Sequence, residues 1–286
     1  MNLTEYYFNK DFEKRKAIHW ELLKVPLLRY RETAFVPIDA DKDPVLRYRN
    51  IGTPSFLIKE LGDVDFPFHF FCSIQRLRHS MEVFKCVECG EIYGSGSNCE
   101  KCSSELKPTL IHADMRENWD KLCWGWDFVV DIDGEGSTTE KKIDNAYQKA
   151  LKVWECYRSY GLPFSVVFSG RGFHYWIFWE DLKQYFKPED YGRANKQLTA
   201  FVAKKTGVKL DTVVAGANRD LIRVPYSLNF RSNLCCLPLT DEQFIDFNSN
   251  MATPESVYTM DIRDRGMMKR EGALETFIED FKDGKK

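Results

Sequence analysis

The chain has 286 residues, 43% of them hydrophobic and 29% charged, which is enough for one large domain or two smaller ones with a sizeable core. Its formal net charge of −2 excludes a strong overall attraction to nucleic acid, so local clusters must supply any such attraction. It contains no apolar run as long as a membrane span and no signal-peptide pattern, so we expect an intracellular protein, cytoplasmic or nuclear, with no membrane partner.

The amino-terminal part mixes aromatic and basic residues. Residues 3–24 have the spacing of a helix, an extended segment is expected from residue 27, and residues 34–38 and 68–74 are typical of strands. Two triplets, Arg29-Tyr30-Arg31 and Arg47-Tyr48-Arg49, alternate arginine with tyrosine, which suits phosphate contact and base stacking. Each triplet alone is more typical of a strand with a basic outer face.

Four of the nine cysteines form two closely spaced pairs, Cys86-x-x-Cys89 and Cys99-x-x-Cys102. Four thiolates at this spacing close a tetrahedral shell around zinc and leave no open position, so the pattern predicts a structural zinc site. Disulfides are the alternative, which the missing secretory signal disfavours. The zinc would stabilise a small insert, residues 84–107, that has little apolar content of its own.

A predicted buried strand, Phe128–Val130, ends in Asp131-Ile132-Asp133. Alternation along a strand places Asp131 and Asp133 on one face, about 7 Å apart along the backbone. Two carboxylates that project together repel each other unless a cation lies between them, and hard divalent metals bind carboxylate oxygens. For an isolated Asp-x-Asp, a solvated strand end that runs into a glycine turn is the better interpretation.

An amphipathic helix is expected from about Thr139 to Gly161, and residues 163–179 then read as two strands around the tight turn Ser169-Gly170-Arg171-Gly172. The glycines would bring backbone N–H groups close to a ligand, while the serine and arginine are donors suited to phosphate. His174 begins the return strand beside this turn. The alternative is an ordinary hairpin with a surface arginine and a satisfied histidine.

A second helix is expected over residues 188–206, and Asp211 then borders an apolar run. Two arginines, Arg223 and Arg231, flank a proline bend further on. Taken alone, Asp211 is typical of a polar strand start and Arg223 of a surface charge. The last residues, 251–286, predict one or two final helices.

Together these motifs, in this order, resemble the archaeo-eukaryotic primase superfamily, and most closely its catalytic small subunit. The residues that produce the resemblance are Asp131-Ile-Asp133, Ser169–Trp176, Asp211 and Leu221–Leu228, with Arg31–Phe35 and Leu46–Tyr48 upstream. The resemblance implies an α+β fold: an RRM-like primase catalytic core, a flanking amino-terminal α/β part and a small four-cysteine zinc-knuckle insert. The corresponding segments are 1–83 for the amino-terminal part, 84–107 for the insert, 108–250 for the core and 251–286 for a carboxy-terminal helical segment.

The function that the resemblance implies is a template-dependent nucleotidyltransferase, a primase or primase-polymerase, which makes short RNA or DNA primers by two-metal catalysis. The catalytic residues, Asp131, Asp133 and Asp211, would hold Mg²⁺ or Mn²⁺. The nucleotide-binding residues would be Ser169, Gly170, Arg171, Gly172, His174 and Arg223. The implied partners are a single-stranded DNA template, nucleoside triphosphates, and a primase large subunit or other replication protein.

The sequence departs from the family pattern at two places. Asn229 and Arg231 occupy nucleotide-binding positions where the family often has histidine and lysine, so Arg231 keeps the charge and Asn229 does not. The cysteine pairs precede Asp131, whereas the family's zinc element usually follows it, which suggests a diverged or mobile-element relative. Binding of template or of the initiating nucleotide is one role open to such a knuckle. The alternative functions are a non-catalytic zinc-bearing nucleic-acid-binding module and another Asp-x-Asp enzyme, such as a nuclease or glycosyltransferase.

Overall fold

The computed structural model describes residues 3–8, 28–37, 46–49, 59, 68–78, 80–112, 119–210, 221–260 and 271–284. Asp211 therefore lies outside the described residues. Within these ranges no helix is both long and apolar enough to cross a membrane. The longest, α5 (Thr139–Ser159), is amphipathic and buries only one side.

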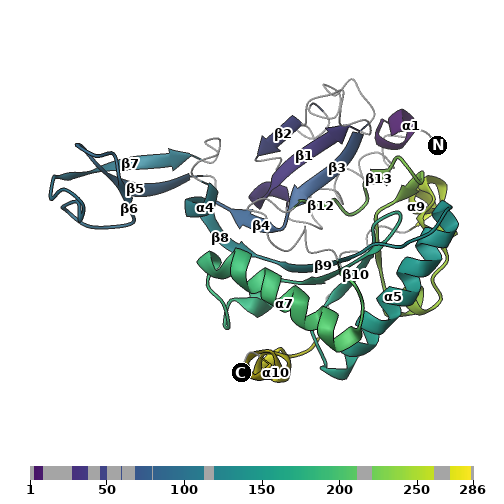
Figure 1. The fold of residues 1–286 in the computed structure, drawn as a ribbon. Helices are drawn as coiled ribbons and strands as arrows, with labels where there is room; N and C mark the ends of the chain where they lie inside the picture. The colour runs from purple at the N-terminus through teal and green to yellow at the C-terminus, as the bar shows by residue number, and fades with distance from the viewer. Residues whose placement is uncertain are drawn as a thin grey trace.

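A four-stranded antiparallel sheet, which we call the central sheet, forms the middle of the molecule (Figure 1). Its order is β15-β10-β11-β9, and its strands are β9 (Phe128–Ile132), β10 (Ser165–Phe168), β11 (Phe173–Ile177) and β15 (Leu237–Leu239). The predicted hairpin is confirmed, because β10 pairs with β11 in antiparallel register and places Val167 opposite His174.

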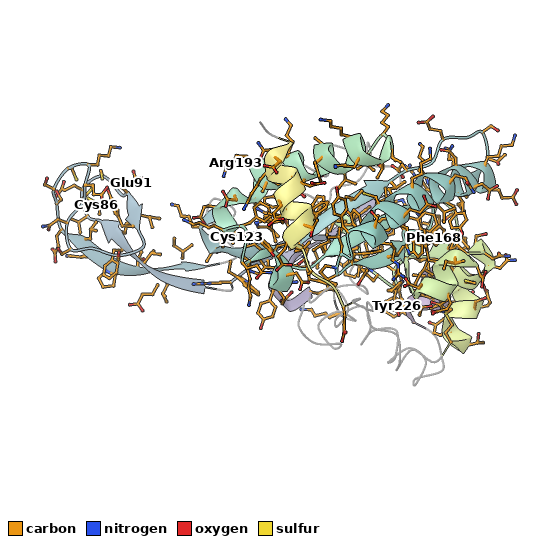
Figure 2. The ribbon with its side chains drawn as sticks, turned by 90° about the horizontal axis from the view of Figure 1, so that it is seen from below. Cys86, Glu91, Cys123, Phe168, Arg193 and Tyr226 are labelled. Atoms are coloured by element: carbon orange, nitrogen blue, oxygen red, sulfur yellow. The ribbon has the colours of Figure 1, made fainter. Side chains whose placement is uncertain are left out.

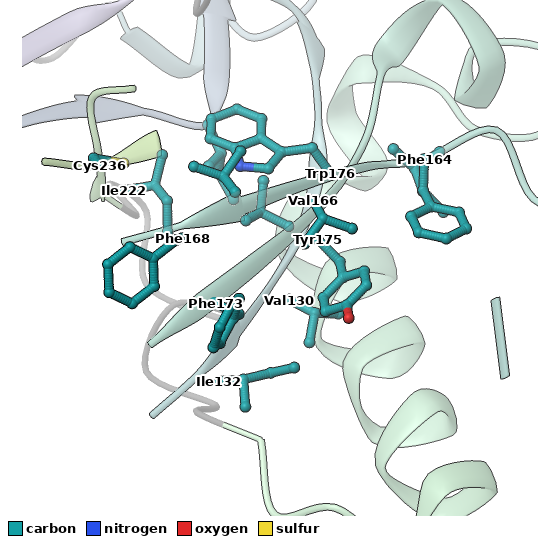
Figure 3. Close-up of a cluster of buried hydrophobic side chains, with 14 of the residues drawn as sticks. Val130, Ile132, Phe164, Val166, Phe168, Phe173, Tyr175, Trp176, Ile222 and Cys236 are labelled. Atoms are coloured by element: carbon teal, nitrogen blue, oxygen red, sulfur yellow. The ribbon is translucent and has the colours of Figure 1, made fainter. Parts of the chain in front are cut away.

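The pairing of β9 with β11 decides which side chains share a face. Val130 lies opposite Tyr175, and Asp131 lies opposite His174. Because neighbouring residues of a strand point to opposite faces, Val130 and Tyr175 share one face while Asp131 and His174 share the other. Figure 3 shows Val130 and Tyr175 on the helix side and the Trp176 indole on the opposite side. Asp131 and His174 therefore project away from the helices.

Helices α5 and α7 (Tyr191–Thr206) cover the apolar face of the central sheet (Figure 1). Both predicted helices are confirmed, the second with a short 3₁₀ turn, η3 (Pro188–Asp190), before it. Thr138 caps the start of α5, because its hydroxyl accepts a hydrogen bond from the Lys141 N–H at 3.2 Å. The buried side of α5 is Ile143, Ala146, Ala150, Val153 and Tyr157.

A second four-stranded sheet, the amino-terminal sheet, lies on the other side of the central sheet (Figure 1). Its order is β12-β3-β1-β2, with β1 (Glu32–Pro37), β2 (Leu46–Arg49), β3 (Phe68–Ser73) and β12 (Leu221–Arg223). The segment before β1 is a 3₁₀ turn, η1 (Leu28–Tyr30), and not the extended segment expected after Pro26. Of the helix predicted over residues 3–24, α1 (Leu3–Tyr7) is described.

The four cysteines lie on an arm that is built on a three-stranded sheet and projects from the body (Figures 1 and 2); Cys86 ends a strand, and the other three lie between strands. Its strands are β5 (Ser80–Cys86), β6 (Ile92–Tyr93) and β7 (Leu106–His112). The arm is joined to the body through β4 (Gln75–Leu77) on one side and α4 (Trp119–Leu122) and β8 (Cys123–Trp126) on the other. Figure 2 places Cys86 at one end of the molecule and Phe168, just before the predicted turn, near the other.

Shorter elements complete the fold, and the expected carboxy-terminal helices are present within the described residues. They are α6 (Trp179–Leu182), β13 (Leu228–Asn229), β14 (Leu234–Cys235), α8 (Asp241–Ile245), η4 (Ser249–Ala252), α9 (Pro254–Thr259) and α10 (Glu275–Asp283). The strands β13 and β14 form a two-stranded hairpin, and α10 packs below α7 (Figure 1).

A buried ion-pair network joins the amino-terminal sheet to the central sheet. Arg31 is 2% exposed, and its guanidinium donates to the fully buried Asp127 carboxylate and to the Ser73 carbonyl at 2.7 Å. Arg76 donates to the other Asp127 oxygen at 2.7 Å and pairs with Glu180. Arg31 is therefore neither the phosphate contact nor the exposed strand residue that its triplet predicts. It holds the two sheets together.

Candidate active site

A cleft of about 540 Å³ lies between the central sheet and the amino-terminal sheet. It contains every described residue of the predicted catalytic and nucleotide-binding set except the two glycines: Asp131, Asp133, Ser169, Arg171, His174, Arg223, Asn229 and Arg231. These residues come from three separate stretches of the sequence. The predicted third carboxylate, Asp211, lies outside the described residues.

The two described carboxylates stand at the end of β9. Asp131 is half-buried, and its Oδ1 lies 3.4 Å from Nε2 of His174 on the neighbouring strand. Asp133 follows the strand and is exposed. Burial, and secondarily the charge of Arg223, lowers the pKa of His174 to about 3, so its imidazole is neutral at neutral pH. Its buried Nδ1 has no hydrogen-bond partner among the described residues.

The turn between β10 and β11 packs so closely that its glycines are required. A Cβ on Gly172 would lie 2.3 Å from the Ile132 carbonyl oxygen, and Gly170 has a φ of +93° with its Cα against Asn229. The Gly172 N–H is already used within the turn, because it donates to the Ser169 hydroxyl at 3.0 Å. The glycines therefore place Ser169 and the turn against the end of β9, a packing role in addition to the nucleotide binding predicted for them.

Arg223 is a buried cation. It is 8% exposed and forms no ion pair with a carboxylate of the described residues, so the surface charge expected of it in isolation is wrong. Its guanidinium lies over the Phe71 ring at 4.8 Å, and its Nη1 lies 3.1 Å from Nδ1 of His69. Burial lowers the pKa of Arg223 to about 10, which leaves the group charged at neutral pH.

The geometry fixes the protonation state of His69. A guanidinium has only donors, so Arg223 must donate and Nδ1 of His69 must accept, which leaves the proton of the neutral imidazole on Nε2. The same state follows from the pKa of His69, which burial and the nearby arginines lower to about 3. His69 thus orients Arg223 through one nitrogen and keeps an N–H on the other.

Six further cleft residues come from the amino-terminal sheet and are not among the predicted site residues: Val36, Pro37, His69, Phe71, Leu221 and Ile222. Among the residues of β1 and β3, His69 offered a signal, since it is a polar residue between the aromatic residues of strand β3. Its role depends on β12 lying next to β3, a pairing between segments about 150 residues apart.

The charges of the cleft suit a polyanion with divalent cations. Three arginines, Arg171, Arg223 and Arg231, line it together with two neutral histidines. Arginine binds phosphate oxygens through parallel hydrogen bonds, and hard cations take carboxylate oxygens. The donor set of Asp131 and Asp133 therefore fits Mg²⁺ or Mn²⁺, and the arginines fit the phosphates that such ions accompany.

The four arm cysteines converge, and their sulfurs all lie within 4.8 Å of one another. Individual separations are 3.4 Å for Cys86 and Cys102, 3.5 Å for Cys89 and Cys99, and 3.7 Å for Cys89 and Cys102. A tetrahedron with Zn–S bonds of about 2.3 Å has sulfurs roughly 3.8 Å apart. A hydrogen bond from Tyr93 is the main cause that lowers the pKa of Cys99 to about 6, which favours the thiolate. The cluster could hold a zinc ion.

Comparison with known proteins gives a likeness in structure alone. No family model matches the sequence, and no curated protein matches it. Among solved structures, the polymerase domain of Ligase D from Mycobacterium tuberculosis, in complex with DNA, has a TM-score of 0.53 at 14% identity and covers 93% of this chain and 95% of that one. The archaeo-eukaryotic primase-type domain of the primase-polymerase from cyanophage S-2L has a TM-score of 0.41 at 11% identity, covering 82% and 96%. The first of these likenesses shows that the chain has the α+β fold of that polymerase domain, here with a four-cysteine cluster.

Proposed function

We propose that the protein is a template-dependent nucleotidyltransferase, a primase or primase-polymerase, that joins nucleoside triphosphates on single-stranded DNA. The observation that supports this most strongly is Arg223, a buried cation with no carboxylate partner among the described residues, in the same cleft as Asp131 and Asp133. A buried charge is costly unless it is paired, so this arrangement favours an anionic ligand as the partner. The likeness in fold to a DNA-bound polymerase domain agrees with the proposal.

We assign each polar side chain of the cleft a role in binding the triphosphate or the metal ions. Arg171 and Arg223, together with the Ser169 hydroxyl, bind the triphosphate, and His69 keeps the Arg223 guanidinium in position. Asp131 and Asp133, with Asp211 as the third carboxylate, hold Mg²⁺ or Mn²⁺. When bound, such ions neutralise phosphate charge and lower the pKa of the attacking 3′-hydroxyl.

The four-cysteine cluster holds structural zinc in this proposal. The arm has two small apolar clusters, one with Cys86, Cys99 and Leu106 buried beside the cysteines and one with Val83, Ile111 and Leu122, so bound zinc would add substantially to its stability. Purified protein should contain about one zinc per chain. Chelation should then expose the amides of residues 80–112 to hydrogen exchange, while the central sheet keeps its protection.

The central test is incubation with a primed or unprimed single-stranded template, Mg²⁺ or Mn²⁺ and labelled triphosphates. Wild-type protein should extend or start chains, and Asp131→Ala should lose at least about 10³-fold in rate, because this carboxylate is proposed to hold the ion. Asp144→Ala is the matched control, since Asp144 is exposed on α5 and does not line the cleft.

Three outcomes contradict the proposal and separate the alternatives. Cleavage of the template without use of triphosphates indicates a nuclease. Transfer of sugar indicates a glycosyltransferase. Unaltered DNA binding by an Asp131→Ala, Asp133→Ala variant, with no wild-type activity under any metal or template, indicates a non-catalytic binding module. Dependence on an added large subunit would instead extend the proposal to that partner.

A further inference from the structure

Phe230 displays its ring to solvent. Its side chain is 41% exposed, and it is the only exposed aromatic among the residues whose side chains the structure describes. Its ring takes part in none of the ring contacts found within the described part of the chain. Single exposed apolar residues are common, so exposure alone implies no function. The surroundings of Phe230 provide the second observation.

Phe230 lies between two residues of the cleft. Asn229 and Arg231 both line the cleft, whereas Phe230 does not. Because it is adjacent to them in sequence, Phe230 stands at the rim of the cleft. From this position the ring contacts a ligand at the entrance of the cleft, and not one bound inside it.

The loop that presents Phe230 is held in one shape. Asn229 donates to the Ser169 carbonyl at 3.3 Å, accepts from the Arg231 N–H at 3.2 Å, and its carbonyl accepts from the Ser232 N–H at 3.2 Å. Asn233 closes the turn with a φ of +54°, and β13 pairs with β14 on either side. The loop thus fixes an aromatic ring next to a cation at the mouth of an anion-binding cleft.

We propose that Phe230 is a stacking platform for a base of the single-stranded template as it enters the cleft. This inference rests on the proposed function, which supplies a single strand as the partner. Alternating aromatic and basic side chains bind single strands because each base offers a face to a ring while the phosphates meet the cations. The ring contributes through stacking, and Arg231 beside it contributes through charge.

The two contributions are distinguishable by experiment. Loss of a stacking ring weakens binding of single strands about 5- to 150-fold but leaves the dependence of affinity on salt unchanged. Loss of a phosphate contact lowers the salt slope by about 0.7 for a single strand, whatever the bases are. An abasic oligonucleotide keeps the phosphates and removes the bases, so it reports the second effect alone.

The test measures the affinity of full-length protein for a labelled single-stranded DNA and for its abasic counterpart by fluorescence anisotropy over a range of salt. Phe230→Ala should weaken binding of the normal strand about 5- to 150-fold, leave the abasic strand within about 2-fold, and keep the salt slope. Phe230→Trp should bind like wild type. Ile245→Ala, which changes another exposed apolar residue, on α8 and outside the cleft lining, is the matched control and should have no effect.

Other outcomes overturn the inference. Equal weakening by Phe230→Ala for both strands, or none for either, means that the ring stacks on no base. Loss of binding in Phe230→Trp as well means that the loop shape and not the ring matters. If the wild-type protein binds no single strand, both this inference and the proposed function are wrong. If Phe230→Ala weakens binding strongly in a protein that incorporates no nucleotide, the result supports this inference and counts against the proposed function.

Discussion

The buried arginines of this molecule differ in whether a carboxylate neutralises their charge. Arg31 and Arg76 share the fully buried Asp127 carboxylate, and Arg76 also pairs with Glu180. Arg223 is buried to a similar degree but has a neutral imidazole and an aromatic ring as its neighbours. The charges of Arg31 and Arg76 are balanced by the carboxylates of Asp127 and Glu180. Arg223 lacks a carboxylate partner among the described residues.

This difference indicates what each arginine does. Removing a charge from water is costly, and a protein compensates that cost with an opposite charge when the residue serves stability. Where the described residues supply no such charge, an anionic ligand can provide the compensation. We therefore interpret the Asp127 network as a structural joint between two sheets and Arg223 as part of a binding site for an anion. Residue type and burial alone do not make this distinction.

The largest expected effect is on stability, at the joint. Asp127→Asn removes the charge that compensates two buried guanidiniums, so it should lower the free energy of unfolding by about 3–5 kcal/mol, as breaking a buried pair typically does. The hydrogen bond from the Trp179 N–H to Asp127 at 2.9 Å can persist with asparagine, so the effect combines loss of the charge with loss of one of the two acceptor oxygens. Urea unfolding followed by circular dichroism measures it.

Asp144→Asn provides the control for this substitution, because Asp144 is exposed and should shift stability by less than about 0.5 kcal/mol. A similar small change for Asp127→Asn would mean that the network contributes little. The assignment of Arg31 and Arg76 to a structural joint would then be wrong.

The second expected effect is on binding, at Arg223. Arg223→Met should weaken binding of inorganic tripolyphosphate about 10- to 150-fold, because hydrogen bonds to charged groups contribute about 1.5–3 kcal/mol. Its Tm should stay the same or rise, since the variant no longer buries an uncompensated charge. Isothermal titration calorimetry and thermal unfolding measure the two quantities in metal-free buffer.

Arg31→Met is the matched substitution at the joint, and it should show the reverse pattern: a lower Tm and nearly unchanged tripolyphosphate affinity. If both variants lose stability equally, Arg223 has a structural role and the comparison fails.

The parts of the site that the sequence predicts are those encoded by local spacing. Paired cysteines, a carboxylate pair after an apolar run, and a glycine turn between two strands each depend on residues a few positions apart, so their geometry follows from backbone periodicity. The structure brings the cysteines together and forms the hairpin as expected. The α+β fold that the resemblance implied agrees with the likeness in fold to a polymerase domain.

The parts that the sequence does not predict depend on which segments meet. Whether Arg31 contacts phosphate or Asp127 is decided by a partner 96 positions away, and Arg223 is buried because β12 pairs with β3. No local pattern identifies His69 as the acceptor for Arg223. Periodicity assigns a residue to a face of its own strand, but it does not say what covers that face.

The third expected effect is a dependence of stability on pH. Burial and Arg223 lower the pKa of His69 to about 3, whereas a free imidazole has a pKa near 6.5. Between these values the unfolded chain binds a proton that the folded chain does not. The free energy of unfolding therefore falls as the pH decreases from about 6.5 toward 3, by at most ~1.4 kcal/mol per pH unit from this group.

His174 acts in the same direction, because burial lowers its pKa to about 3 as well. The difference between wild type and His69→Asn therefore isolates His69, and the variant should have the shallower acid limb in urea unfolding at several pH values. Parallel curves would contradict the neutral state that the contact with Arg223 requires of His69.

The smallest expected effect is on the orientation of Arg223 by His69. His69→Leu removes the acceptor at Nδ1, so the guanidinium loses its fixed position and tripolyphosphate affinity should fall about 3- to 10-fold, the range of one ordinary hydrogen bond. His69→Asn places an amide oxygen near the position of Nδ1 and should restore affinity to within about 2-fold of wild type. In an Arg223→Met background neither substitution should change affinity further, because the group to be oriented is gone. A loss in His69→Asn as large as in His69→Leu would instead assign the contribution to the N–H at Nε2, and His69 would then bind the anion directly.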